Sequence, residues 1–329
     1  MKNTKIICFF TIIFFLITAP VFSQATIENL SKKVNDFSGA MLKSLPFNST
    51  IGLNWSDAYI GKLFPSIPPH FGIGIAAGAT TMPVTSLKGL TDLFNINVPS
   101  LAVGLPLPAY VMEGRIGGLF LPFDIGVKFG FLNENELLAK TLDGMNIRYQ
   151  LIGADIRYSL EPGILPIKAS IGLGYNRLEG GLSKTLKGYG QSFSFFGNTL
   201  NISNPDLGFI WETNMLELKA QISIPLIIIT PYAGAGVSYA WSKAGYQVKS
   251  NLSVNDGESI DSYVNFIKQL GITNITSTGF EQIIKDKDWN MRLFGGLSLN
   301  MALIKLDFTG MLNVRDGGLG FTLGLRFQL

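Results

Sequence analysis

The last eleven residues, LGFTLGLRFQL (Leu319–Leu329), alternate without a break between apolar side chains and small or polar ones. A β-strand points successive side chains to opposite faces, so this pattern predicts a strand with one oily face and one wet face. The sequence stops on this strand, at a hydrophobic residue. We therefore expect the strand to belong to a membrane-embedded sheet, since the end of a soluble sandwich would tolerate a polar tail.

Four residues of this strand also form a recognisable order of residue types. Thr322, Gly324, Phe327 and Leu329 follow the pattern polar-x-Gly-x-x-aromatic-x-apolar. This order resembles the C-terminal signal that the outer-membrane assembly machinery reads, although most members of that class end in Phe. The resemblance implies that barrel-assembly machinery is a partner of the chain.

The N-terminus has the features of a secretory signal peptide. Lys2 and Lys5 precede an apolar run, Ile6–Ala19, and a small residue follows at Ser23. These features predict a signal peptide over residues 1–24. The only cysteine, Cys8, lies within it, so we expect the mature chain to have neither a disulfide nor a lipid-anchored cysteine.

The composition after the signal peptide is apolar without a helical membrane span. Only 15% of the residues are charged, and the longest apolar run, Ile222–Ile229, is interrupted by Ser223 and Pro225. High hydropathy diluted at every second residue is typical of a transmembrane β-barrel, which implies outer-membrane lipid as its surroundings and the cell outer membrane as its location. A net charge of +3 favours no nucleic-acid partner.

Ten segments from residue 70 onward have a strand period. They are residues 71–79, 109–117, 123–131, 146–160, 167–175, 216–222, 233–241, 289–299, 302–308 and 319–329. They predict an all-β fold, an antiparallel transmembrane β-barrel of 10–14 strands over residues 47–329, with twelve or fourteen strands if residues 101–107 or 179–212 also pair. A weaker alternation covers Ile51–Ser56. In the fourth segment the parity slips, which predicts a bulge near Leu151.

The connections alternate between short and long. Residues 225–231 and 300–301 are brief, whereas residues 179–212 and 243–288 are extended. Outer-membrane barrels have short periplasmic turns and long extracellular loops, so this asymmetry favours a barrel over a secreted β-sandwich. Within the long loops we predict a hairpin around Phe193–Leu200 and helical pieces at Ser86–Phe94, Asn133–Met145, Ile260–Leu270 and Phe280–Lys287.

An amphipathic helix precedes the strands, over residues 25–46. Ile27, Leu30, Val34, Phe37 and Met41 recur at helical spacing, and the pattern ends at Pro46. One interpretation is a helix that lies against the periplasmic rim, and the other is a plug inside the barrel.

The polar faces of the predicted strands carry charges of both signs. We expect these side chains to line the lumen, because a charge on the lipid face is costly. They form either a polar pathway or a lumen closed by salt bridges. The candidate lumen-lining residues are Glu113, Arg115, Asp124, Lys128, Arg148, Asp155, Arg157, Lys168, Glu217, Lys219, Arg292, Lys305, Asp307 and Arg326. The candidate aromatic girdle consists of Tyr149, Tyr158, Tyr175, Tyr239, Trp241 and Trp289.

Catalytic and cofactor motifs are absent from the sequence. His70 is the only histidine, and it follows two prolines at the start of a strand, which favours a structural role in a turn. The chain has no Gly-Lys-Ser/Thr phosphate loop, no HExxH and no Gly-x-Ser-x-Gly. We therefore expect no catalytic residues, no cofactor, no metal site and no enzymatic activity.

More narrowly, the chain resembles the long-chain fatty-acid transporter (FadL-like) family. The resemblance rests on the helical segment before the first strand and on apolar helical pieces in the loops, Leu87–Phe94 and Ile260–Leu270. It implies an outer-membrane channel or transporter for passive uptake of small hydrophobic solutes. The alternative is a non-conducting structural or adhesive outer-membrane protein that displays long extracellular loops.

Overall fold

The structure is a computed structural model. It describes residues 24–60, 69–82, 104–118, 122–132, 145–160, 167–185, 191–195, 198–202, 204, 206–249, 252–254, 275–276 and 279–329. The predicted signal peptide up to residue 23 and the predicted loop helices at Ser86–Phe94 and Ile260–Leu270 lie outside these residues, as do residues 133–144 of the predicted helix at Asn133–Met145.

Ten antiparallel strands close into a barrel, as the ten sequence segments predict. The strands are β1 (His70–Met82), β2 (Leu105–Gly117), β3 (Phe123–Leu132), β4 (Met145–Ser159), β5 (Lys168–Thr185), β8 (Asp206–Ser223), β9 (Ile229–Lys249), β12 (Gly279–Met301), β13 (Ile304–Asn313) and β14 (Leu319–Gln328). Neighbours in this order pair with one another, β14 pairs with β1, and β9 pairs with β12 across the long connection. Each of these ten strands therefore has a paired neighbour on both sides, which removes the sheet edges of the barrel itself.

The outward face of the barrel is apolar along its strands. Ile73, Phe131 and Leu325 are 56%, 58% and 47% exposed, and their even-numbered neighbours point inward. Because lipid offers no hydrogen bonds, a closed barrel with an oily exterior is one of two structures that can cross a membrane. The chain is therefore an outer-membrane β-barrel.

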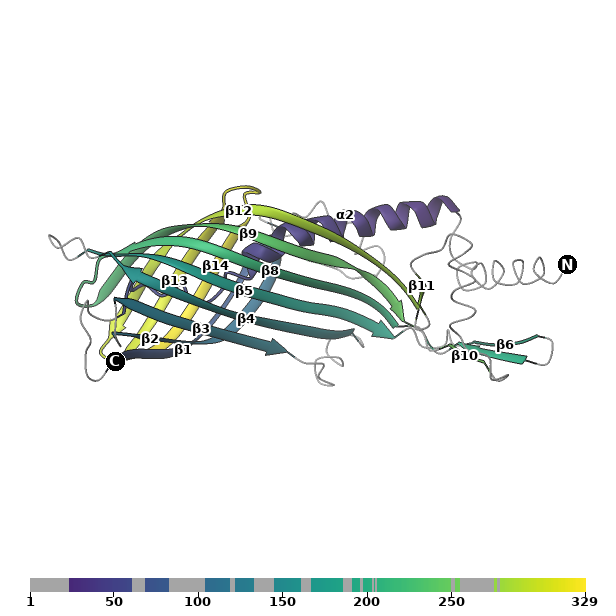
Figure 1. Ribbon diagram of the computed structural model, residues 1–329, viewed down its shortest axis with the longest axis horizontal. Coiled ribbons are helices and arrows are strands. Elements are labelled where there is room, and N and C mark those ends of the chain that lie inside the picture. Colours follow the sequence, from purple (N-terminus) through teal and green to yellow (C-terminus); the bar gives the residue numbers. More distant parts are fainter. Residues whose placement is uncertain are drawn as a thin grey trace.

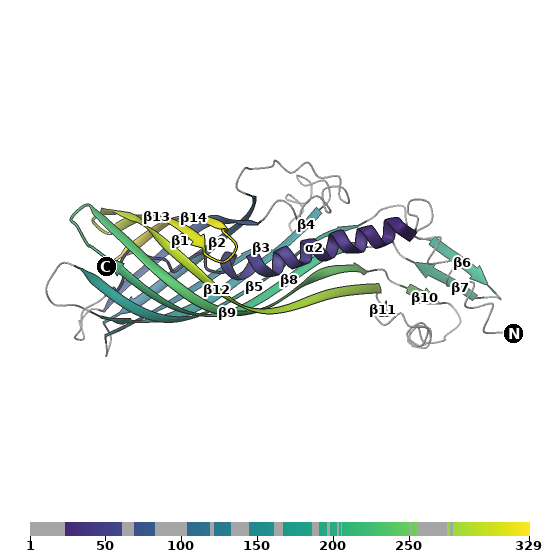
Figure 2. The same cartoon turned by 90° about the horizontal axis from the view of Figure 1, so that it is seen from above.

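The strands differ in length and form a taller wall on one side. β3, β13 and β14 have 10 residues each, whereas β9 has 21 and β12 has 23. The long strands continue together toward the short strand β11 (Ile275–Thr276), as Figures 1 and 2 show. The predicted helix at Phe280–Lys287 is wrong, because these residues belong to β12 and pair with β9.

A small separate sheet lies beyond the wall. It consists of β6 (Gln191–Phe195), β7 (Asn198–Ile202) and β10 (Leu252–Val254). β6 and β7 pair as a hairpin from Gln191 to Ile202, which confirms the hairpin predicted around Phe193–Leu200. The sheet is near the end of the molecule opposite Leu329 (Figure 1). We call this end the long-loop end, and the end that holds residues 224–228, 302–303 and Leu329 the short-turn end.

The pairing of β4 with its neighbours is continuous. Each residue from Met145 to Ser159 has a partner on β5 without an extra residue, so the predicted bulge near Leu151 is wrong. Tyr149 and Leu151 are buried and point inward, like Asp155 and Arg157 further along the strand. The parity slips in the sequence because the inner face itself changes from apolar to charged along β4.

Residues 24–60, which precede β1, run into the barrel. Helix α2 (Gln24–Asn48) has its Gln24 end beside the long-loop end, and it continues through Pro46 rather than ending there (Figures 1 and 2). Residues 49–60 then lie inside the barrel without forming a strand, which corrects the weak strand predicted at Ile51–Ser56. None of the described helices combines the length and the apolar character that a membrane-spanning helix needs.

Candidate functional site: the filled lumen

Most of the predicted lumen residues point into the barrel. Eleven of them are at most 6% exposed: Glu113, Arg115, Asp124, Lys128, Asp155, Arg157, Glu217, Lys219, Arg292, Asp307 and Arg326. Lys168 and Lys305 are half-buried at the short-turn end of their strands. Arg148 is exposed and lies on the outward face of β4, so its placement in the lumen is wrong. The slip of parity at Leu151 led to this error, because it put the even-numbered Arg148 on the same face as the odd-numbered Asp155.

A segment of the same chain occupies the space between these side chains. Residues 49–60, which we call the lumen segment, are all buried, and Ile51, Ala58 and Tyr59 are 0% exposed. Gly52 and Leu53 both have positive φ values, 84° and 59°, which turn the segment within the lumen. The lumen is therefore filled along this segment.

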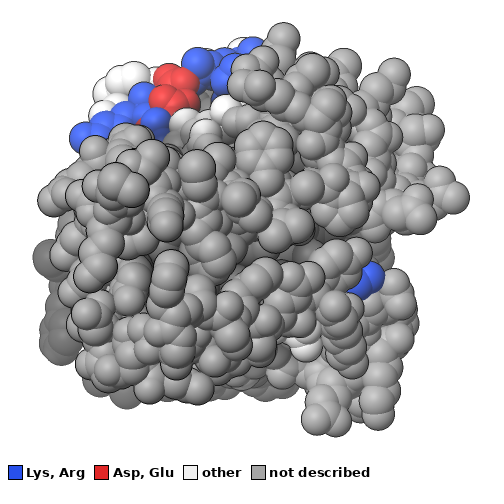
Figure 3. All heavy atoms as spheres, turned by 90° about the vertical axis from the view of Figure 1, so that its right-hand side faces the viewer, with Lys and Arg blue, Asp and Glu red and all other residues white. Residues whose placement is uncertain are grey.

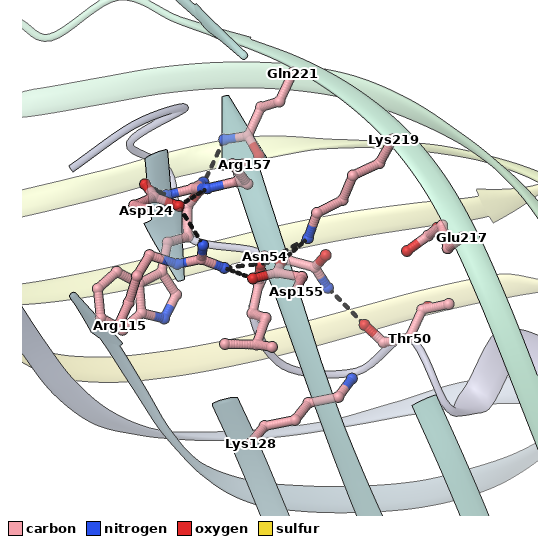
Figure 4. Close-up of polar contacts among 12 residues, drawn as sticks. Thr50, Asn54, Arg115, Asp124, Lys128, Asp155, Arg157, Glu217, Lys219 and Gln221 are labelled. Atoms are coloured by element: carbon pink, nitrogen blue, oxygen red, sulfur yellow. Dashed lines mark hydrogen bonds and ion pairs between the residues drawn. The ribbon is translucent and has the colours of Figure 1, made fainter. Parts of the chain in front are cut away.

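An ion-pair cluster from the four strands β2, β3, β4 and β8 borders the segment. The Arg115 guanidinium lies 2.5 Å from Asp124 and 2.6 Å from Asp155, and the Arg157 guanidinium lies 2.6 Å from Asp124 (Figure 4). Lys219 completes the cluster through a 2.6 Å contact with Asp155. Buried charges of this kind are tolerated only when they are paired and hydrogen-bonded, and here each carboxylate has two cationic partners.

Cationic side chains also bind the backbone of the lumen segment. The Lys128 Nζ donates hydrogen bonds to the carbonyl oxygens of Ser49 and Ile51, at 2.8 and 2.6 Å. The Arg157 guanidinium donates to the carbonyl of Asp57 at 2.8 Å. Because the segment has no strand partner, side chains of the wall supply the bonds that its backbone needs.

Carboxylates accept bonds from the segment's N–H groups. Glu113 accepts hydrogen bonds from the Leu53 backbone N–H at 2.5 Å and from the Trp55 indole Nε1 at 2.7 Å. Asp124 accepts one from the Ile60 backbone N–H at 2.9 Å. The wall therefore pairs acids with segment donors, and bases with segment acceptors.

The segment contributes one charge of its own, at Asp57. Its carboxylate lies 2.9 Å from the Arg326 guanidinium and 2.9 Å from the Lys305 Nζ. Arg326 also contacts Asp307 at 2.6 Å, and its Cζ lies 4.5 Å from the centre of the Trp55 ring. The fixed negative charge on the segment therefore neutralises cations on β13 and β14.

A third contact joins the segment to the tall wall. The Arg292 guanidinium forms an ion pair of 2.5 Å with Glu217 and donates a 3.1 Å hydrogen bond to the Asn54 side chain. The Tyr232 hydroxyl donates to the carbonyl of Asn54 and also contacts the Thr309 hydroxyl. The segment is consequently held from β9, β12 and β13 as well as from β2 and β3.

The lumen changes character above the segment, toward the long-loop end. The buried residues of α2, Phe37, Met41, Leu42 and Leu45, pack in one apolar cluster with wall residues Tyr149, Leu151, Leu178, Phe209 and Phe294. The Phe37 and Phe209 rings meet edge to face, with centroids 4.8 Å apart. The interior thus has a charged lower part around the lumen segment and an apolar upper part toward the long-loop end.

The outward surface carries aromatic residues below a belt of charges. The Tyr239 and Trp289 rings lie 5.1 Å apart, and Trp289 is 62% exposed. Farther along β9, Lys243 pairs with Glu212 of β8 at 2.7 Å, and a recess of about 130 Å³ is lined by Arg148, Glu179 and Glu212 among others. Figure 3 views the long-loop end, where basic and acidic side chains adjoin on the rim. Tyr149 is buried, so its place in the predicted girdle is wrong.

Three residues of the predicted assembly signal, Thr322, Gly324 and Phe327, lie on β14, which joins β13 to β1, and Leu329 follows the strand directly. Thr322 points into the lumen and is 3% exposed, whereas Phe327 and Leu329 face outward at 39% and 47% exposure. Gly324 lies opposite Ala76 of β1, and the Leu329 N–H donates to the carbonyl of Phe71 at 2.9 Å. Recognition by assembly machinery stays a prediction.

Several residues of the site were not among the predicted ones. Asn54 and Trp55 lie in the segment that the alternation assigned to a weak strand, and Asp57 follows it. Gln221 binds the carbonyls of Trp55 and Ser56 at 2.7 and 3.3 Å. The polar residues between Ile51, Leu53 and Trp55 were the available signal. Within the described residues, no group of three or more His, Cys, Asp or Glu side chains could hold a metal ion.

Comparison with known proteins finds matches among solved structures only. No family model and no curated protein matches the chain. Solved structures that match include the translocator domain of the autotransporter NalP from Neisseria meningitidis, at 8% identity, over 93% of this chain and 99% of that one, with a TM-score of 0.37. The toluene transporter TbuX of Ralstonia pickettii matches at 10% identity, over 86% and 92%, with a TM-score of 0.28. The attachment invasion locus protein Ail of Yersinia pestis matches at 10% identity, over 79% and 97%, also with a TM-score of 0.28.

Proposed function

We propose that this protein is an outer-membrane barrel sealed by its own chain, which displays the Gln24 end of helix α2 and the long loops outside the cell without forming an open pore. The observation that supports this most is the complete burial of the lumen segment, residues 49–60. Ions would need a continuous water-filled path, and the charged groups that could line one are bonded to the segment instead.

The direction of the chain supports the display part of the proposal. α2 enters the barrel from the long-loop end, and the Ile60 N–H binds Asp124 near the short-turn end of β3. Because outer-membrane barrels keep their short turns in the periplasm, the long-loop end faces outward. The Gln24 end of α2 is then on the cell surface, together with β6, β7 and β10.

Planar-bilayer recordings of the refolded chain from residue 25 test the seal. We expect silence from the natural sequence and from the control variant Arg177→Met, whose side chain lies on the outer wall. Lys128→Met removes two bonds to the segment, and we expect transient openings from it. Stepwise conductance of the natural sequence, with a heat-dependent gel shift to show that the barrel had folded, would contradict the sealed barrel.

An epitope tag inserted after Ala25 tests the display. We expect antibody to label intact cells. A tag at Gly317, in the β13–β14 turn on the long-loop end, is the positive control and should be labelled in the same way. A tag in the connection between β4 and β5, at the short-turn end, is the matched control and should be labelled only after the outer membrane is permeabilised. Labelling of the Ala25 tag only after permeabilisation would contradict the proposed direction of α2.

A second function, uptake of small hydrophobic solutes, is favoured by the apolar upper lumen. The cluster around Phe37, Leu45 and Phe294 would offer an oily surface if α2 moved. Uptake of the dye N-phenylnaphthylamine by cells that produce the natural chain or Lys128→Met distinguishes the two functions. Faster dye entry with the natural chain than with an empty vector would favour uptake, and equal entry would favour display.

A further inference from the structure

The connections at the short-turn end are unusually apolar. Between β8 and β9 the chain reads Ile224-Pro-Leu-Ile-Ile228, and Ile227 and Ile228 are 96% and 68% exposed. In the adjacent β12–β13 turn, Met301 and Leu303 are 54% and 45% exposed. A turn in the aqueous periplasm would be expected to carry polar residues, so these exposed side chains need an apolar partner.

The backbone of the same turn is bonded internally. The Ile224 N–H donates to the Pro231 carbonyl at 3.0 Å, and the Leu226 N–H donates to the Ile229 carbonyl at 2.9 Å. From the neighbouring strand, the Asn300 N–H donates to the Ile228 carbonyl at 2.7 Å, and the Asn300 side chain donates to the Leu226 carbonyl at 3.3 Å. Internal bonding of this kind is what hydrocarbon requires, because it offers no partner to a free polar group.

The height of the barrel places this turn at the membrane boundary or within it. Along β9 the outward residues are apolar from Ile229 to Val237, reach the aromatic Tyr239, and are followed by Lys243. At about 3.3 Å per residue and a tilt of roughly 40°, the path from Ile229 to Tyr239 rises about 25 Å, which is the full height of a typical apolar band. The apolar outward residues of β9 therefore begin at its first residue, Ile229, and no polar outward residues separate them from the turn on the periplasmic side.

We infer that the apolar part of the short-turn end, residues 224–229 and 301–304, is inserted among the acyl chains of the inner leaflet of the outer membrane. Its apolar surface is continuous with the lipid-facing surface of β8, β9, β12 and β13, so the same partner covers both. The described turn at the opposite end differs, because Arg315 and Asp316 are exposed there. The inference does not depend on whether the lumen conducts.

Site-directed fluorescence tests the inference directly. The chain has no cysteine after Cys8, so Ile227→Cys and the control Asp316→Cys each provide one site for an NBD label. Both variants are folded into phosphatidylcholine vesicles, with iodide on both sides of the membrane or with nitroxide-labelled lipid. We expect nitroxide lipid to quench the label at position 227 several times more than the label at position 316, and iodide to do the reverse.

The vesicles contain no other protein, which separates lipid from a periplasmic partner. Equal iodide quenching at positions 227 and 316 would overturn the inference. It would show that the turn is in water when no protein is present to cover it. If labelling at position 227 prevents folding, Ile227→Trp replaces it. Its tryptophan emission is compared with that of the natural chain under brominated lipid, and no added quenching would likewise contradict insertion.

Discussion

The indole N–H of Trp55 donates a 2.7 Å hydrogen bond to the carboxylate of Glu113, in the middle of the barrel. The same carboxylate accepts the Leu53 backbone N–H at 2.5 Å. Both groups are at most 5% exposed, so water does not compete for either bond. This pair joins the lumen segment to β2 and makes the segment part of the folded core.

Replacing Trp55 with Phe should loosen the segment. The change removes the indole donor but keeps an aromatic ring beside Arg326, whose Cζ lies 4.5 Å from the ring centre. Because Glu113 then loses a buried partner, we expect the free energy of unfolding to fall by about 1–3 kcal/mol. Urea titration of the vesicle-folded protein measures this change. Trp289→Phe, on the lipid face, is the control, and an equal loss from both variants would contradict a specific role for the Trp55 bond.

Gly52 should tolerate no side chain. It has a φ of 84°, and an added Cβ would lie 2.5 Å from the Val111 side chain. Gly317 has a similar φ of 70° but open space around it. We expect Gly317→Ala to cost about 1 kcal/mol for its backbone conformation and Gly52→Ala to cost clearly more, since it adds a clash in the lumen.

Thermal gel-shift midpoints of the two alanine variants measure this difference. Midpoints lowered by the same amount would show that the lumen segment yields to the added methyl group. That result would weaken the picture of a rigid seal.

The period of two predicts the strands because both faces of the barrel obey it for separate reasons. Lipid requires apolar residues outside, as at Ile73 and Phe131, and the charged lumen requires polar residues inside, as at Asp124 and Arg157. Where one requirement changes, the prediction is wrong. Tyr149 and Leu151 pack in the apolar cluster with α2, and the neighbouring Arg148 and Gln150 are exposed, so the inner face of β4 is apolar there and its parity is misread.

The lumen segment could not be identified from its own pattern. Ile51, Leu53 and Trp55 alternate with polar residues as a strand would, yet both sets are buried. The polar set meets side chains more than 200 positions away in the sequence, since Arg292 binds the Asn54 side chain and Arg326 binds the Ser56 hydroxyl. A local pattern carries no information on these partners, and the same limit applies to the choice between a helix at the rim and a helix inside the barrel.

Cysteine labelling checks the register of β4. Arg148 is exposed on the outer wall and Tyr149 is buried inside, with its ring 5.8 Å from the ring of Tyr110. We expect Arg148→Cys to react with a membrane-impermeant maleimide on intact cells and Tyr149→Cys to stay unlabelled until the protein is denatured. Reaction of the Tyr149 variant alone would contradict this register and support the predicted bulge near Leu151.

We expect Asp57 to stabilise the barrel through its ion pairs with Lys305 and Arg326 rather than through the volume of its side chain. Asp57→Asn keeps the shape but leaves Lys305 without its 2.9 Å partner and Arg326 with Asp307 alone. Removal of one partner from a buried ion pair lowers the free energy of unfolding by about 3–5 kcal/mol. We expect a loss no larger than this, because Lys305 is half-buried. Lys305→Met alone should cost less for the same reason.

The double variant Asp57→Asn/Lys305→Met separates pairing from packing. If the attraction between the two charges is the stabilising interaction, the double variant should lose less than the sum of the single losses, by about 0.5–3 kcal/mol. Unfolding free energies of all four proteins in the same vesicles complete the cycle. Strict additivity would mean that Asp57 acts through Arg326 alone, since their 2.9 Å contact is unchanged by the substitution at Lys305.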